Sequence, residues 1–385
     1  MRVARAWSIE DLRRLARRRL PRSVFDFFDG GSEDEATLRD NVAAFQRVRL
    51  LPRALVDVSA VDLSTRLLDA PSALPIAVAP TGVAGFGWRG ADVAIARAAA
   101  GFGIPYTLST SATASIERIA REAPGRLWFQ AYVLKPREFT LGLIERARVA
   151  GYEALMITVD LAVGGKRERD FRNDFAVPFR FTRRNMLDFA SRPPWALDML
   201  MRGVPSLENL EGFAHGASGA AAAASSVGRN HDPSFTWDDL KGMRDRWPGK
   251  LIVKGIVRPD DAERATALGV DALVVSNHGG RQLDAGIATL DALPAVVAAV
   301  GRRASVWVDG GIRRGGDVLK ALALGAQGVL IGRATLYGAC AAGEPGARRA
   351  LEILRDELTR TMQLCGARRI ADIGADLVVP STAPR

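Results

Sequence analysis

The chain has 385 residues, 48% of them hydrophobic, so it can bury a large core as two domains or as one barrel with insertions. Two cysteines, with no Cys/His cluster, argue against a disulfide framework or a structural zinc, and no metal site is expected. The net charge of +10 comes mostly from arginines spread along the chain; without a nucleic-acid motif, this favours a GC-rich genome over nucleic-acid binding.

An N-terminal helical segment is predicted over residues 1–73. Its basic start lacks the continuous apolar core of a secretory signal and predicts an amphipathic helix beginning at Ser8, with Glu10 and Asp11 in the first turn. No apolar run in the chain approaches the roughly 18 residues of a membrane span. We therefore expect a cytoplasmic protein.

From about residue 74, short apolar runs alternate with amphipathic helical stretches. Continuous apolar strands indicate a parallel sheet covered on both faces. Eight strand–helix units in a row predict an α/β fold of the (β/α)8 TIM-barrel type, with a doubly wound open sheet as the alternative. The candidate strands are residues 74–79, 104–109, 126–133, 153–160, 250–255, 271–277, 305–311 and 327–332.

One long insertion after the fourth strand interrupts these units. We expect a single domain over 1–385, with the barrel in 74–160 and 250–385 and the insertion, or lid, with the fourth helix in 161–249. The Ala/Ser-rich stretch 216–228 is typical of a flexible lid. The segment 176–210 mixes Arg with Trp, Met, Phe and Leu, which fits packing against the protein or peripheral contact with a membrane.

Polar groups stand at the carboxyl ends of nearly all the predicted strands, where barrels of this type place their active sites. The strand ends converge on one rim, so these polar groups would lie close together. Such a concentration of polar groups indicates a functional site. They are Thr81, Ser109, Gln130, Tyr132, Thr158, Asp160, Lys254, Ser276 through Arg281, Asp309 through Arg313, Gly332 and Arg333.

His278 is the candidate general base among the three histidines. It directly follows the sixth strand, and a histidine base suits proton transfer near neutral pH. Asp160, at the end of the fourth strand, would orient the ring and stabilise the imidazolium. Arg281 and Arg167 can each bind a substrate carboxylate through a bidentate fork. The other two histidines, which flank the Ala/Ser-rich stretch and are expected at the solvated surface, are His215 and His231.

Glycine-rich turns follow the seventh and eighth strands, in the segments 309–317 and 325–333. Barrels commonly bind phosphate at this position through backbone N–H groups and a helix N-terminus. Arg313 and Arg333 would add positive charge. Two such loops with arginines predict a phosphorylated cofactor.

At these motifs the sequence resembles the FMN-dependent family that oxidises 2-hydroxy acids, which includes glycolate oxidase and L-lactate dehydrogenase. The segment SNHGGRQLD (276–284) is highly specific for that family, and the similarity extends from LPRSVFDFFDGGSEDEATLRDN (20–41) to the last helix. DLAVGGKRERD (160–170) and PPWALDML (193–200) look most like the (S)-mandelate dehydrogenase branch. That branch uses its insertion to dock on a membrane. The resemblance therefore implies, as a second possible location of this protein, the inner face of the cell membrane as a peripheral protein.

The resemblance implies FMN as the cofactor and assigns roles residue by residue. Tyr132 would hydrogen-bond the substrate, Arg167 and Arg281 would hold its carboxylate, and His278, paired with Asp160, would remove a proton. The sequence leaves open whether the hydroxyl proton or the α-carbon proton leaves first. The residues implied to contact the flavin ring system, with Lys254 at its N1/O2 edge, are Ala79, Pro80, Thr81, Ser109, Gln130, Thr158, Lys254 and Ser276. Those implied to hold the ribitol and phosphate are Asp309, Gly311, Arg313, Gly332 and Arg333.

One substrate-binding position departs from the family pattern, and two others differ from glycolate oxidase. Phe27 stands where the family usually has a carboxylate-binding tyrosine, which removes a hydrogen bond worth roughly 0.5–3 kcal/mol and predicts altered binding rather than inactivity. Ser111 and Gly164 stand where glycolate oxidase has a bulky Trp and a Leu. The smaller walls favour a larger, aromatic substrate side chain.

The leading expectation is FMN-dependent oxidation of a bulky, mandelate-like (S)-2-hydroxy acid to the 2-oxo acid, with a quinone or oxygen as electron acceptor. The alternatives are an oxidase that produces hydrogen peroxide, an L-lactate dehydrogenase, and a non-oxidising FMN barrel such as an isomerase, which would not need the pair formed by His278 and Arg281. The resemblance also implies a homotetramer.

Overall fold

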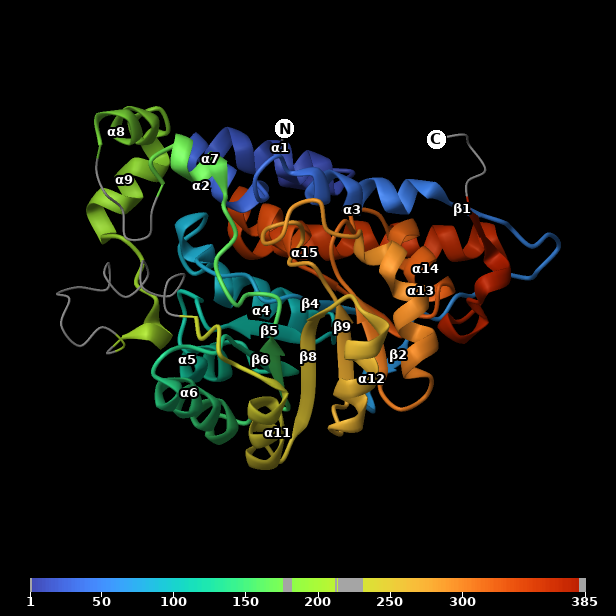
Figure 1. Cartoon of the computed structure of the whole chain (residues 1–385). Helices are drawn as coiled ribbons and strands as arrows, with labels where there is room; N and C mark the ends of the chain where they lie inside the picture. The colour runs from blue at the N-terminus through green and yellow to red at the C-terminus, as the bar shows by residue number, and fades with distance from the viewer. Residues whose placement is uncertain (1, 176–181, 212, 214–230, 381–385) are drawn as a thin grey trace.

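The computed structural model describes residues 2–175, 182–211, 213 and 231–380, and its centre is a closed barrel of eight parallel strands (Figure 1). This confirms the predicted TIM barrel and excludes the open sheet. Every strand lies within its predicted range except β8, which continues one residue further. The strands are β4 (Ile76–Val78), β5 (Tyr106–Ser109), β6 (Leu127–Ala131), β7 (Ala154–Thr158), β8 (Lys250–Ile256), β9 (Ala272–Val275), β10 (Ser305–Val308) and β11 (Gly328–Ile331).

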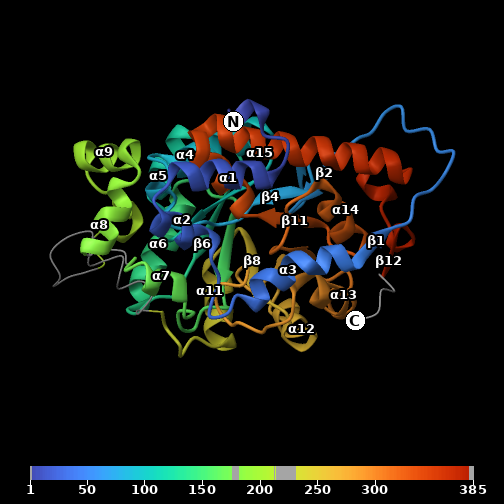
Figure 2. The same cartoon turned by 90° about the horizontal axis from the view of Figure 1, so that it is seen from above.

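A layer of helices surrounds the strands, as Figure 2 shows from above. The strands are buried nearly throughout, which explains why their sequences are continuously apolar rather than alternating. The long last helix packs against both the first helix of the chain and α4. The helices between and after the strands are α4 (Ala91–Gly101), α5 (Ile116–Glu122), α6 (Arg137–Val149), α11 (Trp237–Arg246), α12 (Pro259–Ala267), α13 (Thr289–Val300), α14 (Gly315–Ala323) and α15 (Arg333–Cys365).

The interior of the barrel is filled by side chains, so the barrel is not a pore. Trp128 and Trp307 stack at 5.1 Å between ring centroids and belong to a buried cluster inside the strands. Leu67 and Leu68, from the hairpin of β2 (Thr65–Leu67) and β3 (Ala70–Ser72), belong to the same cluster, and Leu67 lies against Gly328 at the start of β11. One end of the barrel is therefore closed by this hairpin, and the carboxyl ends of the strands remain for a ligand.

The N-terminal segment is helical, as predicted. Helix α1 (Ile9–Arg19) begins after Ser8, whose side chain accepts a hydrogen bond from the backbone N–H of Asp11. Helices α2 (Arg22–Asp29) and α3 (Ala36–Arg47) follow, and β1 (Val48–Leu50) pairs with β12 (Val378–Pro380). Helix α2 carries Phe27 and Phe28 to the barrel mouth.

The described part of the insertion forms α7 (Glu168–Arg172), α8 (Arg183–Ala190) and α9 (Pro193–Arg202), and the last two lie beside the barrel (Figures 1 and 2). The Asp188 carboxylate accepts hydrogen bonds from the backbone N–H groups of Arg22 and Ser23 at the start of α2, both at 2.8 Å. Trp195 is buried and donates from Nε1 to the Phe86 carbonyl. One face of the insertion thus packs on the protein. The predicted lid 216–228 and His215 lie outside the described residues.

Candidate active site

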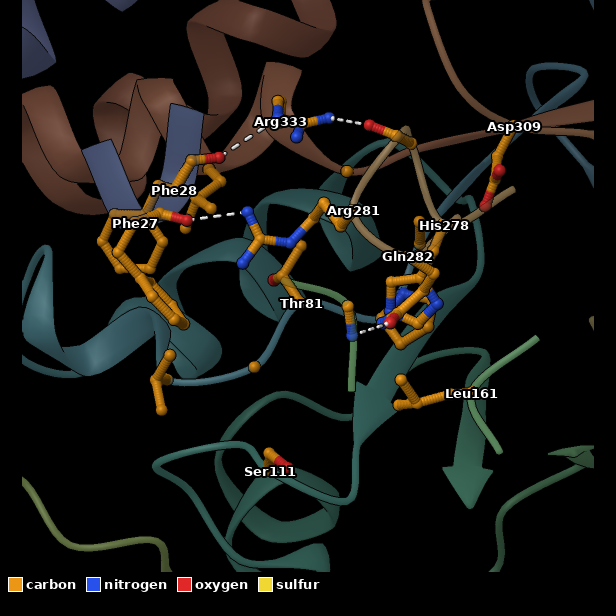
Figure 3. A pocket seen from close by; sticks show the side chains of 18 of the residues that line it. Phe27, Phe28, Thr81, Ser111, Leu161, His278, Arg281, Gln282, Asp309 and Arg333 are labelled. Carbon is orange, nitrogen blue, oxygen red and sulfur yellow. Dashed lines mark hydrogen bonds between the residues drawn. The ribbon is translucent and has the colours of Figure 1, made fainter. Parts of the chain in front are cut away.

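A cavity of about 550 Å³ lies at the carboxyl ends of the strands and extends to α2 and the insertion. Figure 3 shows Arg281, Arg333, His278 and Asp309 around it. The predicted site residues that line the cavity are Phe27, Ala79, Pro80, Thr81, Ser111, Tyr132, Gly164, Arg167, Lys254, His278, Arg281, Asp309, Gly311, Arg313, Gly332 and Arg333. The predicted residues buried behind these walls are Ser109, Gln130, Thr158 and Ser276.

His278 and Asp160 form the central hydrogen bond of the site. Nδ1 of His278 lies 2.9 Å from Oδ1 of Asp160, and its Nε2 lies 3.3 Å from the Tyr132 hydroxyl. The two residues follow β7 and β9, and β8 runs between them. There Gly255, with φ of +112°, leaves room for Asp160, because a Cβ would come within 2.7 Å of the Asp160 Cβ. The strand order therefore positions the carboxylate to orient the ring.

Backbone strain marks the same region. His278 has φ of +57° and Val83, which also lines the cavity, has φ of +54°; for a β-branched residue such a value is a genuine outlier. The backbone N–H of His278 donates to the Ser276 hydroxyl, which holds the turn. Strained residues of this kind cluster at active sites and ligand clamps.

The pKa shifts of His278 and Asp160 leave both groups in the protonation states that a general base and its carboxylate partner require. Burial lowers the pKa of His278 below its ordinary value, although Asp160 opposes this shift. Burial disfavours the Asp160 carboxylate, but His278 and Lys254 together hold the pKa of Asp160 below its ordinary value. At neutral pH the imidazole is thus neutral and can accept a proton, while the carboxylate is ionised and can stabilise the cation that results.

Two guanidinium groups face the substrate side of the cavity across Phe27. The guanidinium carbons of Arg167 and Arg281 lie 5.4 and 5.1 Å from the centre of the Phe27 ring, within cation–π distance. Arg281 also donates to the Phe27 carbonyl (Figure 3) and to the Gly30 carbonyl. Burial, with Arg167 and Arg333 nearby, lowers the pKa of Arg281 to about 9, so it stays charged at neutral pH. Positive charge crowded into a buried site favours an anionic ligand.

Arg333 has a structural contact that the sequence did not suggest. Its three side-chain nitrogens donate to the carbonyls of Phe28, Gly279 and Gly30, at 3.1, 3.0 and 2.8 Å. It therefore ties the end of α2 to the loop that follows His278. Because a guanidinium carries five N–H donors, two remain for a ligand in the cavity.

Buried polar atoms without hydrogen-bond partners, together with a glycine-rich loop, fit the predicted FMN. Among the described residues, Nε2 of Gln130 and Oγ1 of Thr158 are buried without a hydrogen-bond partner, although buried polar atoms are nearly always paired. Lys254 is the neighbour of Thr158 across β7 and β8, and it contacts Ser276 Oγ at 2.8 Å and Asp309 at 3.3 Å. Gly311, with φ of +84°, approaches the backbone of Asn41 too closely for any side chain. These groups offer the donors and positive charge that a phosphorylated, polar-edged cofactor needs.

Comparison with known proteins decides the family. The profile of the FMN-dependent dehydrogenases matches residues 16–380. The chain belongs to this family. The (S)-mandelate dehydrogenase of Pseudomonas putida is 42% identical over 98% of this chain and 96% of its own, and an L-lactate dehydrogenase of Pseudomonas aeruginosa (strain LESB58) is 42% identical over 96% and 97%.

Solved structures agree with this assignment. The crystal structure of the monotopic membrane protein (S)-mandelate dehydrogenase has a TM-score of 0.94, with 41% identity, 98% of this chain covered and 100% of that chain. Mandelate oxidase has a TM-score of 0.82, with 38% identity over 97% and 98% of the two chains. The predicted family, barrel and FMN cofactor of this FMN-dependent dehydrogenase are thereby confirmed.

The prediction for His231 was wrong. The residue is 7% exposed, lines the cavity, and packs edge-to-face on Tyr132 with 5.0 Å between ring centroids. Burial, and secondarily His278, lowers its pKa to about 4, so the ring is neutral. The sequence also failed to identify the apolar side chains that the insertion supplies to the wall, which are Leu161, Phe171, Phe175 and Leu207. These side chains come from an irregular insertion, where no periodic pattern signals which residues face inward.

The Asp160→Asn variant of this FMN-dependent dehydrogenase should show how the carboxylate acts. We expect kcat to fall about 10²-fold, because the imidazole remains but loses its orientation and the charge that stabilises imidazolium. Since Asp160 raises the pKa of His278, its removal should move the acid limb of the pH profile of kcat/KM to lower pH. An acid limb displaced to higher pH, or an unchanged kcat, would contradict this role.

Proposed function

We propose that the protein oxidises an (S)-2-hydroxy acid with a bulky or aromatic side chain, mandelate-like, to the 2-oxo acid, with His278 as the base. The observation that carries the proposal is a neutral imidazole, hydrogen-bonded to a carboxylate, in the same cavity as the two arginines Arg167 and Arg281. The similarity to (S)-mandelate dehydrogenase and L-lactate dehydrogenase supports a 2-hydroxy acid as the substrate class.

Each catalytic side chain has a task in this proposal. Arg281 and Arg167 bind the carboxylate, and Tyr132 donates a hydrogen bond to the substrate. His278 receives the proton at Nε2, the nitrogen that faces the cavity side of the ring, while Asp160 at Nδ1 stabilises the imidazolium. Bound FMN supplies the acceptor for the two electrons of the substrate. Lys254 stays protonated, since Asp309 and Asp160 overcome the effect of burial on its pKa, and places positive charge beside the cofactor site.

The residues that would hold FMN include the buried polar groups without partners and the cationic side chains of the cavity. The flavin ring system would be held by the backbone at Ala79–Thr81 and by Ser109, Gln130, Thr158, Lys254 and Ser276. The ribitol and phosphate would be held by Asp309, Gly311, Arg313, Gly332 and Arg333. In this arrangement the orphaned atoms of Gln130 and Thr158 gain partners.

The size of the substrate side chain follows from Ser111 and Gly164, which both line the cavity. Ser111 has a short side chain and Gly164 has none, so the cavity has room for an aromatic ring on the substrate. Leu161 and Leu207, which line the cavity, would contact that ring.

Restoring the family tyrosine tests the role of Phe27. In Phe27→Tyr, the added hydroxyl should hydrogen-bond the substrate carboxylate, so KM should fall about three- to tenfold. Phe27→Tyr keeps the aromatic ring that lies between Arg167 and Arg281, whereas Phe27→Leu removes it. We therefore expect Phe27→Leu to raise KM. Steady-state kinetics of both variants check the prediction; an unchanged KM and kcat in Phe27→Tyr would count against it.

The electron acceptor distinguishes the leading proposal from its nearest alternative. A dehydrogenase passes electrons to a quinone, whereas an oxidase passes them to oxygen. The similarity to mandelate oxidase supports oxygen as the alternative acceptor. Turnover of (S)-mandelate, (R)-mandelate and L-lactate should be measured with a redox dye and, separately, with oxygen and peroxide detection. Turnover of (S)-mandelate with dye and little peroxide supports the dehydrogenase. Preference for L-lactate or for oxygen would select an alternative, and no turnover would reject the proposal.

We further propose peripheral membrane contact through the segment 176–210. None of the described helices combines the length and apolar character that crossing a membrane requires. In α9, Leu197, Leu200 and Met201 share one helical face and are exposed, Leu200 by 83%, and Leu187 of α8 is exposed by 74%. The similar (S)-mandelate dehydrogenase is described as a monotopic membrane protein, which supports this assignment. The implied homotetramer is a separate proposal, to be tested by the mass of the protein in solution.

Charged substitutions test the membrane contact. Leu187→Glu with Leu200→Glu should reduce binding to vesicles of mixed zwitterionic and anionic phospholipid about tenfold or more, because two apolar side chains lose their burial in lipid. Leu364→Glu, at an apolar position of α15 that is 70% exposed, is the matched control and should bind as the wild type does. Equal vesicle binding by the double variant would reject the segment as the contact.

A further inference from the structure

His231 is a polar residue that the proposed mechanism does not use. It stands at the end of the insertion, and its backbone forms an isolated antiparallel bridge with Leu134, beyond the end of β6. The next residue, Asp232, donates its backbone N–H to the Val133 carbonyl and pairs with Arg137 at 2.6 Å. These contacts with the segment that follows β6 therefore fix where the imidazole lies.

The imidazole has hydrogen-bonding capacity that the described protein does not satisfy. It contacts Tyr132 through its ring, but no hydrogen bond or ion pair joins its nitrogens to any residue in the described part of the chain. The ring is neutral, so it offers one N–H donor and one nitrogen acceptor to the cavity that it lines. Because His231 is only 7% exposed and lines the cavity, a polar group of a ligand in the cavity can pair with its ring.

The two histidines of the cavity lie near the same tyrosine. The ring centroid of Tyr132 is 6.2 Å from that of His278 and 5.0 Å from that of His231. Both imidazoles thus line the same cavity against one tyrosine, so a substrate that reacts at His278 could extend an aromatic side chain toward His231. The insertion supplies two other polar side chains to the wall, Arg167 and Asp170, and these pair with each other at 2.8 Å.

We propose that His231 is a specificity-determining residue that hydrogen-bonds a polar substituent at the far end of the substrate side chain. This inference rests on the proposed oxidation of 2-hydroxy acids and narrows its substrate class. The preferred substrates would be aromatic 2-hydroxy acids with a ring hydroxyl, such as (S)-4-hydroxymandelate, rather than purely apolar ones. A site built to pair with a hydroxyl discriminates against an analogue that lacks it.

The test compares (S)-4-hydroxymandelate with (S)-mandelate in the FMN-loaded enzyme. In the wild type, kcat/KM should favour the hydroxylated substrate. In His231→Phe, which keeps an aromatic ring on Tyr132, the ratio of the two kcat/KM values should fall about tenfold, mainly through KM of the hydroxylated substrate. His231→Asn, which keeps a donor and an acceptor, should preserve part of the preference.

Leu207→Val is the matched control, because it alters the same insertion wall without changing its polarity. It should change kcat/KM for both substrates by a similar factor and leave their ratio intact. A ratio that stays constant in His231→Phe, or a wild type without preference, would overturn the role of His231 while leaving the proposed oxidation standing. A wild type that oxidises neither acid would instead reject the proposed function on which this inference rests.

Discussion

The His278→Asn variant is expected to lose about 10³- to 10⁴-fold in kcat with retention of its flavin. The reason is that general acid–base catalysis contributes up to about this much, and that His278 is the imidazole that a carboxylate orients. Tyr132 contacts Nε2 of His278, but burial raises the pKa of Tyr132 above its ordinary value, so it is a poor base. Lys254 stays protonated and is likewise unable to accept the proton.

Single-turnover reduction under anaerobic conditions measures this loss at the chemical step. Flavin absorbance serves as the control for folding, because a variant that binds FMN has kept the barrel mouth. His231→Asn is the matched variant, since it changes the other histidine of the cavity in the same way. Flavin reduction in His278→Asn at a rate within tenfold of the wild type would contradict the assignment of His278 as the base.

The Arg281→Met variant is expected to lower kcat/KM about 10²- to 10³-fold, with part of the loss in KM. Removing one partner of a buried, hydrogen-bonded charge pair costs about 2–5 kcal/mol, because the substrate carboxylate would be buried without its partner. Arg281 also ties α2 through the carbonyls of Phe27 and Gly30, so Arg281→Lys, which keeps the charge but not the fork, is needed beside it.

Arg167→Met provides the comparison within the same site. Its Nε already donates to Asp170 at 2.8 Å, so less of its charge is available to the substrate and the loss should be smaller than for Arg281. The binding of a 2-oxo acid to each variant, measured as quenching or shift of the flavin spectrum, separates affinity from rate. If Arg281→Met bound the 2-oxo acid as tightly as the wild type, Arg281 would not be the carboxylate anchor.

The barrel could be predicted because its strands are buried on both faces, which leaves eight continuous apolar runs in the sequence. The polar strand ends could be predicted as a site for a related reason. Once the strand order is known, Asp160 and His278 must emerge at the same rim, with one strand between them. The observed distance of 2.9 Å between them follows from that topology and from the room left by Gly255.

The insertion could not be interpreted in the same way. His231 faces the cavity because its backbone bridges to Leu134 and because Asp232 pairs with Arg137, and these contacts join segments about 95 residues apart. Nothing in the local sequence around His231 reports such a pairing, and a polar neighbourhood suggests a surface position. The contacts of Arg333 with three backbone carbonyls were missed for a similar reason. Every residue has a backbone carbonyl, so the residue type of a partner does not reveal such a contact.

The most direct test is an anaerobic titration of the purified, FMN-loaded protein with (S)-mandelate and (S)-4-hydroxymandelate. The account predicts that one equivalent of an effective substrate bleaches the yellow flavin absorbance and yields one equivalent of the 2-oxo acid. The (R) enantiomers should leave the absorbance unchanged. A flavin that stays oxidised with every 2-hydroxy acid, including L-lactate, would contradict the assignment of this cavity to 2-hydroxy-acid oxidation.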